Sequence, residues 1–260
     1  MTVWTLHLLN ARHGLTRVLP DIRATARETV ALVSGHADLP PFDLVVRAQP
    51  PGAGDRDLPG GPPQPGLIEI ALNPDRFDPA QMQRQLIRAM HHLIRAEGPG
   101  YGRSLGEALV SEGLAGHFVA LLSGGTVDPR ATTAPPSGLA RRAMNEWSRL
   151  DHDHAHWFLG KGDLRRWAGF GLAQRLVAEH LRGQPGGDAE PLAMLPADAF
   201  RAALRRLVAA EAAPGPDPER ADREPAEDGP EDGPEDAGTD DGAAAAPPAP
   251  DDASSPPAGS

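Results

Sequence analysis

The C-terminal part of the chain limits what the rest can fold into. Residues 214–260 contain no Leu, Ile, Val or aromatic side chain and carry repeats such as EDGPEDGPEDAG. Such a segment buries too little apolar surface to offset the entropy lost on ordering, so we expect it to be disordered. The sequence therefore predicts one domain at 1–213 and an acidic tail at 214–260, and a body of this length can enclose a sizeable core.

The negative charge of the chain belongs to this tail. Residues 214–260 hold 14 acidic residues and 2 arginines, a net of −12, whereas the whole chain carries −11 and the body therefore +1. A near-neutral body gives no support for nucleic-acid binding, so we expect no nucleic-acid partner. The tail is most simply a solubilising extension, and the alternative that it is the functional part carried by the body stays open.

Cellular location is predicted from what the composition lacks. The chain has no cysteine, which excludes disulfides, thiolate metal ligands and a cysteine nucleophile. Residues 1–15 lack a basic start followed by a long apolar run, and no apolar segment approaches the 18 residues of a membrane span. We expect a cytoplasmic protein with no membrane partner, and the sequence carries no signal for its oligomeric state.

The first third of the body is rich in β-forming residues. Three runs of strand length are predicted, at 3–11, 42–48 and 67–72. A helix is predicted at 16–35, with Pro20 near its start and Gly35 past its end. Residues 49–66 are too rich in Pro and Gly to be anything but a loop.

Helices are predicted for the remainder of the body. Asp78 is the N-cap of the first, with Pro79 at the first helical position. Ser104 and Glu107 stand at capping-box spacing and open a second helix that closes at Gly124. Further helices are expected at 138–150, 164–182 and 197–212. Strands followed by helices predict an α+β domain.

The helix that begins at Pro79 contains adjacent histidines, His91 and His92. A zinc-peptidase helix reads H-E-x-x-H, because histidines four residues apart point both imidazoles at one metal and the glutamate polarises the attacking water. Here Arg88 and Ala89 occupy the positions of the first histidine and the glutamate. By spacing alone the run is not a zinc motif, and an isolated histidine pair is most often structural.

Three segments together nevertheless resemble a known family. They are RQLIRAMHHLIR, GPGYGRSLGEALVSEGLAGHF and HAHWFLGKGDLRRWAGFGLAQRLV. They are similar to a bacterial family of predicted zinc-dependent proteases, a domain of unknown function with an H-E-x-x-H-H, V-S-E-G-L-A and W-F-x-G signature. The resemblance covers about residues 3–210. It implies a zincin-like α+β fold with a short twisted sheet, a motif helix and a helical C-terminal half.

The resemblance also implies roles for individual residues. His92 matches the second histidine of the motif, and Glu112 matches the carboxylate expected as the third ligand. His154 or His156 falls where such sites can supply a histidine that stabilises the transition state. The implied cofactor is zinc.

Three departures from the family pattern put catalysis in doubt. Arg88 and Ala89 replace the first histidine and the general base, and Phe170 stands where relatives tend to have Tyr. A catalytic zinc usually has three protein ligands, and only His92 and Glu112 remain of the expected set. General acid–base assistance is typically worth ~10²–10⁴-fold in rate, and alanine cannot supply it. An ordinary zincin mechanism is therefore not expected.

Two functional hypotheses follow. In the first, the chain is a non-catalytic binding or regulatory module without a cofactor, which grips a peptide-like segment along the sheet edge at 67–72. Arg88 would then replace zinc as the counter-charge of Glu112, since a buried carboxylate needs a partner. In the alternative, the chain is an active zinc metallopeptidase that recruits His92, Glu112 and a histidine from 152–156 as substitute ligands. Whether it is an enzyme stays open at this point.

Overall fold

The computed structural model describes residues 2–49, 64–124, 128–183 and 192–212. The chain divides into two units, Met1–Ala213 and Pro214–Ser260, and the described residues all belong to the first. The disorder expected for the acidic tail and most of the predicted 49–66 loop lie outside the described residues.

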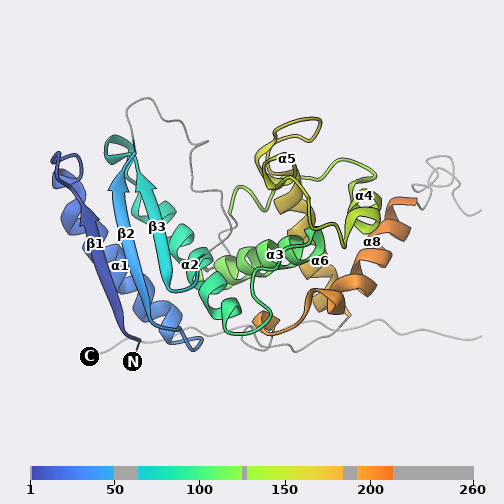
Figure 1. The fold of residues 1–260 in the computed structure, drawn as a ribbon, viewed down its shortest axis with the longest axis horizontal. Helices are drawn as coiled ribbons and strands as arrows, with labels where there is room; N and C mark the ends of the chain where they lie inside the picture. Colours follow the sequence, from blue (N-terminus) through green and yellow to red (C-terminus); the bar gives the residue numbers. More distant parts are fainter. Residues whose placement is uncertain (1, 50–63, 125–127, 184–191, 213–260) are drawn as a thin grey trace, which may run out of the picture. The chain divides into compact units, whose positions relative to one another are not determined.

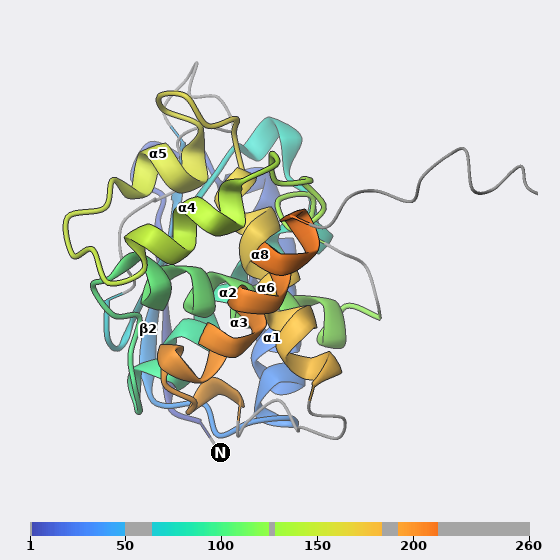
Figure 2. The same ribbon diagram turned by 90° about the vertical axis from the view of Figure 1, so that its right-hand side faces the viewer.

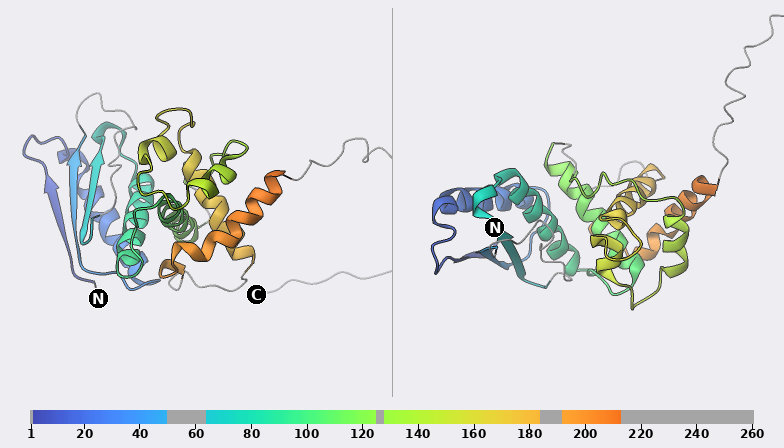
Figure 3. Two further views of the ribbon diagram at one scale, coloured as in Figure 1. Left: turned by 45° about the vertical axis from the view of Figure 1, so that its right-hand side comes forward. Right: turned by 90° about the horizontal axis from the view of Figure 1, so that it is seen from above.

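Three parallel strands form the sheet, in the order β1-β2-β3. They are β1 (Trp4–Leu9), β2 (Phe42–Ala48) and β3 (Leu67–Leu72). The second and third coincide with the predicted runs, because β-branched residues bounded by Pro and Gly leave little choice of element. Helices α1 (Leu19–Ser34) and α2 (Pro79–Ala96) cover one face of this sheet (Figures 1 and 3).

Side chains alternate along each strand between a core and a solvent face. The buried side chains of the sheet include Leu44, Val46, Ile68 and Ile70, which pack with residues of α1 and α2. Thr5, Asp43 and Glu69 point to the opposite, exposed face. Parallel sheets are usually covered on both faces. In the part of the chain that the structure describes, the second face of this sheet is exposed, and its polar side chains suit contact with solvent.

The second half of the body is a layer of helices around a second core. Its helices are α3 (Leu105–Leu122), α4 (Leu139–Glu146), α5 (His154–Leu159), α6 (Ala168–Arg182) and α8 (Arg201–Ala212). Helix α3 contacts both α2 and α6. Helices α4, α6 and α8 lie on the side of α3 that faces away from the sheet (Figures 1 and 2). The predicted α+β class is confirmed, with α3 as the element that joins the two cores.

The predicted helix starts agree with the structure. Asp78 accepts a hydrogen bond from the backbone N–H of Ala80 at 2.9 Å, and Pro79 is the first residue of α2. Ser104 and Glu107 form the complete capping box of α3. These signals are local, so they act wherever the segment lies in the fold.

Other helix limits differ from the prediction. Helix α4 ends at Glu146 because the carbonyl groups of Trp147 and Arg149 accept hydrogen bonds from the first N–H groups of α3. Helix α6 begins at Ala168, since Trp167 has a left-handed backbone with φ of 71°. Helix α5 was not predicted, and the predicted 197–212 helix opens with a 3-10 turn before α8.

The expectation about apolar segments was wrong for α3. Leu105–Leu122 is by length and composition apolar enough to cross a membrane, although it contains Glu107 and Glu112. Most of this segment is buried inside the protein, between α2 and α6. The core helix of a globular domain meets the same test, so this finding is weak evidence for a membrane span.

Candidate functional site

Helices α2 and α3 bring the motif residues together in the interior. Arg88 and His92 lie one turn apart on the face of α2 that meets α3, because residues four apart share a helix face. Glu112 lies near the middle of α3, and all three side chains are buried. The VSEGLA segment also lets α3 pack closely on α6, since a side chain at Gly113 would collide with the carbonyl group of Ala173 in α6.

The carboxylate of Glu112 receives donors on both oxygens. Arg88 Nη1 lies 2.7 Å from Glu112 Oε2 and 3.3 Å from its backbone oxygen. The hydroxyl of Tyr101 donates to Glu112 Oε1 at 3.0 Å. His92 Nε2 is 3.6 Å from the same oxygen, beyond ordinary hydrogen-bond length. The ion pair between Arg88 and Glu112 that the sequence led us to expect is therefore present.

A second carboxylate, Asp128, completes the environment of Arg88. Arg88 Nη2 donates to Asp128 Oδ2 at 3.1 Å, and Arg130 Nη2 lies 3.0 Å from the same atom. The buried residues Arg88, Glu112 and Asp128 and the half-buried Arg130 thus form a cluster of two positive and two negative charges, here called the Arg88 cluster. The sequence analysis missed Asp128 and Arg130, because no local pattern marks a residue that reaches Arg88 from 40 positions along the chain.

The Arg88 cluster keeps both of its carboxylates ionised. Burial by itself would raise the pKa of Glu112, but the charges of His92 and Arg88 hold that pKa well below its usual range. Burial likewise opposes ionisation of Asp128, and Arg88 and Arg130 lower its pKa to about 2. The hydroxyl of Tyr101 has a raised pKa because it is buried and faces the Glu112 carboxylate, so it remains a donor.

Phe170 packs against the cluster from α6. Its ring centroid lies 5.4 Å from the guanidinium carbons of both Arg88 and Arg130, and 4.9 Å from the ring of Phe158. A ring face attracts a guanidinium by cation–π interaction. Phe170 therefore stabilises the two arginines by packing and has no hydroxyl to offer a reacting group.

The two candidate transition-state histidines lie in different surroundings. His154, at the start of α5, has its ring 6.4 Å from that of Tyr101, and burial lowers its pKa. His156 instead bonds outward, with Nε2 2.9 Å from Asp163 and Nδ1 2.8 Å from the carbonyl of Lys161. Only His154 is brought next to the motif residues.

His91 takes no part in the cluster. It is buried against Phe118, with ring centroids 5.4 Å apart, and burial lowers its pKa well below the usual value. His91 is therefore a neutral, packed side chain, which agrees with the structural role predicted from its spacing.

Comparison with known families decides the family of the chain. Residues 40–201 match the family described as "Predicted Zn-dependent protease (DUF2268)". The chain belongs to this family. The matched DUF2268 region runs from just before β2 to the start of α8 and contains every residue of the Arg88 cluster. No curated protein and no solved structure matches the chain.

The DUF2268 description implies zinc, and the residues of this member do not fit such an ion. A zinc ion held by His92 and Glu112 would compete with Arg88, whose Nη1 already lies 2.7 Å from the carboxylate. At ~4 Å and an effective dielectric constant of ~20, a guanidinium and a dication repel each other by about 8 kcal/mol.

The other side-chain atoms that could bind zinc do not fit such an ion either. Zinc-bound histidines usually donate their second ring nitrogen to a carbonyl or carboxylate, whereas Nδ1 of His92 is buried with no partner in the described residues. Within those residues, no three His, Cys, Asp or Glu side chains are grouped so that they could hold a metal ion. In this DUF2268 member the carboxylate of Glu112 is paired with the guanidinium of Arg88.

Proposed function

We propose that this DUF2268 member is a non-catalytic binding or regulatory module that works without a metal. The observation that carries the proposal is the 2.7 Å ion pair between Arg88 and Glu112, which supplies the carboxylate with a cation from the chain itself. Ala89 cannot act as a general base, and Phe170 cannot donate a hydrogen bond to an oxyanion. A zinc peptidase needs a metal ligand, a general base and an oxyanion donor, and Arg88, Ala89 and Phe170 do not supply these functions at their three positions.

The partner that this module would bind is a peptide or an extended protein segment. β3 is an outer strand of the described sheet, and an outer strand offers backbone groups to an added strand. A groove of about 200 Å³ lies at its C-terminal end and is lined in part by Ala71, Asn73 and Gln81. These features support peptide binding along β3, which the family resemblance first suggested.

Metal content tests the proposal directly. Elemental analysis of the tagless full chain, purified without chelators, should find no stoichiometric zinc in the wild type. The matched control is Glu112→Ala, which removes the last acidic ligand expected from the family. Near-stoichiometric zinc that disappears in Glu112→Ala would overturn the proposal.

The second candidate is an active zinc metallopeptidase with substitute ligands. The observation in its favour is that His154 lies beside Tyr101 and that its charge helps to lower the pKa of Glu112, so His92, Glu112 and His154 share one neighbourhood. In that case zinc should be lost in His154→Ala as well as in Glu112→Ala. Peptidase activity should be lost in the same two variants and retained in His156→Ala, whose side chain bonds outward.

A further inference from the structure

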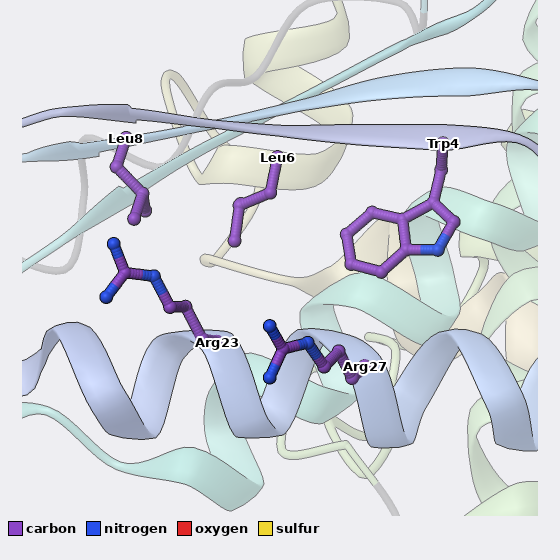
Figure 4. Close-up of a pocket in the computed structure, with 5 residues that line it drawn as sticks. All are labelled: Trp4, Leu6, Leu8, Arg23 and Arg27. Atoms are coloured by element: carbon purple, nitrogen blue, oxygen red, sulfur yellow. The ribbon is translucent and has the colours of Figure 1, made fainter.

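Strand β1 and helix α1 enclose a groove at the other edge of the sheet. The groove has a volume of about 380 Å³ and is lined by Trp4, Leu6, Leu8, Arg23 and Arg27. Figure 4 shows the three apolar side chains projecting from β1 towards the two arginines, which rise from α1. None of these residues belongs to the Arg88 cluster, so the groove is separate from the candidate site.

The β1 wall of the groove is incompletely covered. Trp4, Leu6 and Leu8 face α1 but are only half-buried, whereas the equivalent inward side chains of β2 are fully buried. Among the described residues, β1 pairs with β2 alone. Within the described parts of the chain, its outer edge therefore presents unpaired backbone N–H and C=O groups beside a row of accessible apolar side chains, the arrangement that accepts an added strand.

The α1 wall carries uncompensated positive charge. Arg23 and Arg27 lie one helical turn apart and are exposed, and neither has an ion-pair or hydrogen-bond partner among the described residues. None of the described residues that line the groove is acidic. Some surface arginines elsewhere on the body, such as Arg142 and Arg149, are paired with carboxylates.

We propose that this groove binds an extended acidic segment of a partner protein, which adds to β1 as a further strand. Its apolar side chains would cover Trp4, Leu6 and Leu8, and its carboxylates would meet Arg23 and Arg27. Successive residues of a strand point to opposite sides, and both walls of the groove lie on the α1 side of the sheet. A suitable segment therefore carries apolar and acidic residues together among the alternate positions that face α1.

Charge and composition favour this occupant over two others. In a two-fold pairing of β1 with β1 of a second copy, Arg23 and Arg27 would come close to the same arginines of that copy, and like charges repel. Residues 214–260 of the chain carry carboxylates but no Leu, Ile, Val or aromatic side chain to fill the apolar wall. A partner strand with both kinds of side chain meets both requirements.

A panel of labelled peptides tests the proposal on the full-length protein. The peptides carry Glu together with Val, Leu or Phe at the alternate positions of one strand face, and a matched panel carries Lys in place of Glu. By fluorescence anisotropy at low ionic strength, at least one Glu peptide should bind ~10-fold or more tightly than its Lys counterpart. N-methylation of alternate peptide amides should abolish binding if the peptide adds as a strand.

Protein variants locate the binding. Arg23→Glu/Arg27→Glu should reverse the preference from Glu peptides to Lys peptides, whereas Arg141→Glu/Arg205→Glu, at exposed positions outside the groove, should leave it unchanged. The proposal is overturned if no Glu peptide binds, or if the groove variant keeps the wild-type preference. Because none of these changes touches Arg88, failure here would leave the result of the metal analysis unaffected.

Discussion

The guanidinium of Arg88 lies 2.7 Å from the carboxylate of Glu112 and joins the middle of α2 to the middle of α3. Both side chains are buried, so each would be costly without the other. Asp128 takes the second nitrogen of the same guanidinium at 3.1 Å, and Arg130 neutralises the added charge. The cluster is therefore a charge-balanced structural unit, and four predictions test it and its surroundings.

Restoring the family motif should restore metal binding. In Arg88→His/Ala89→Glu, a histidine stands one turn before His92, and Glu112 loses the guanidinium that competes with a cation. We expect zinc affinity to rise by ~100-fold or more, measured by competition with a chromophoric chelator. The control Arg84→His adds a histidine to the same helix without removing Arg88 and should leave the affinity unchanged. If the double variant gained nothing, Arg88 would not occupy the metal position.

Removing the arginine alone should destabilise the fold. Arg88→Met leaves Glu112 and Asp128 buried with fewer positive partners, and breaking a buried pair from one side costs ~3–5 kcal/mol. Arg88→Met/Glu112→Gln should recover part of this loss, because the unpaired charge is removed as well. Urea unfolding measures both, with Arg84→Met as the control on the same helix. A loss within ~1 kcal/mol for Arg88→Met would contradict the structural role of the pair.

Acid should weaken the cluster through Asp128. The pKa of this carboxyl is lowered from 3.8 to about 2 in the folded protein, so its contribution is complete above about pH 4 and is lost as the pH falls towards 2. The contribution is on the order of 2 kcal/mol. The free energy of unfolding, measured between about pH 5 and pH 2, should fall less steeply in Asp128→Asn than in the wild type. Equal slopes would show that Asp128 does not pair in the folded state.

A side chain at Gly113 should disrupt the packing of α3 on α6. Its Cβ would collide with the carbonyl oxygen of Ala173, which belongs to the backbone and cannot rotate away. We expect Gly113→Ala to lower the free energy of unfolding by ~3 kcal/mol. At Gly35 the nearest atoms to an added Cβ are 3.4 and 3.5 Å away, so Gly35→Ala should be neutral or stabilising by ~0.5 kcal/mol. Similar stability changes in the two variants would rule out this close approach.

Elements whose signals are local could be predicted from the sequence. β2 and β3 have the predicted limits, and the N-cap at Asp78 and the capping box at Ser104 begin their helices where expected. A cap or a run of β-branched residues acts within a few positions, so the surrounding fold has little influence on it. The family motif was readable for the same reason, since each of its parts is a short segment.

The end of α4 and the pairing of the buried charged side chains depend on tertiary packing. The N–H groups of α3 bind carbonyls just after Glu146, and Arg88 reaches Glu112 and Asp128 across 24 and 40 positions of sequence. The packing of the helices brings these buried charges within reach of each other. No local sequence pattern encodes a contact between residues so far apart along the chain. The sequence shows Arg88 where the family pattern has a histidine, and the structure shows that its guanidinium pairs with the buried carboxylates of Glu112 and Asp128.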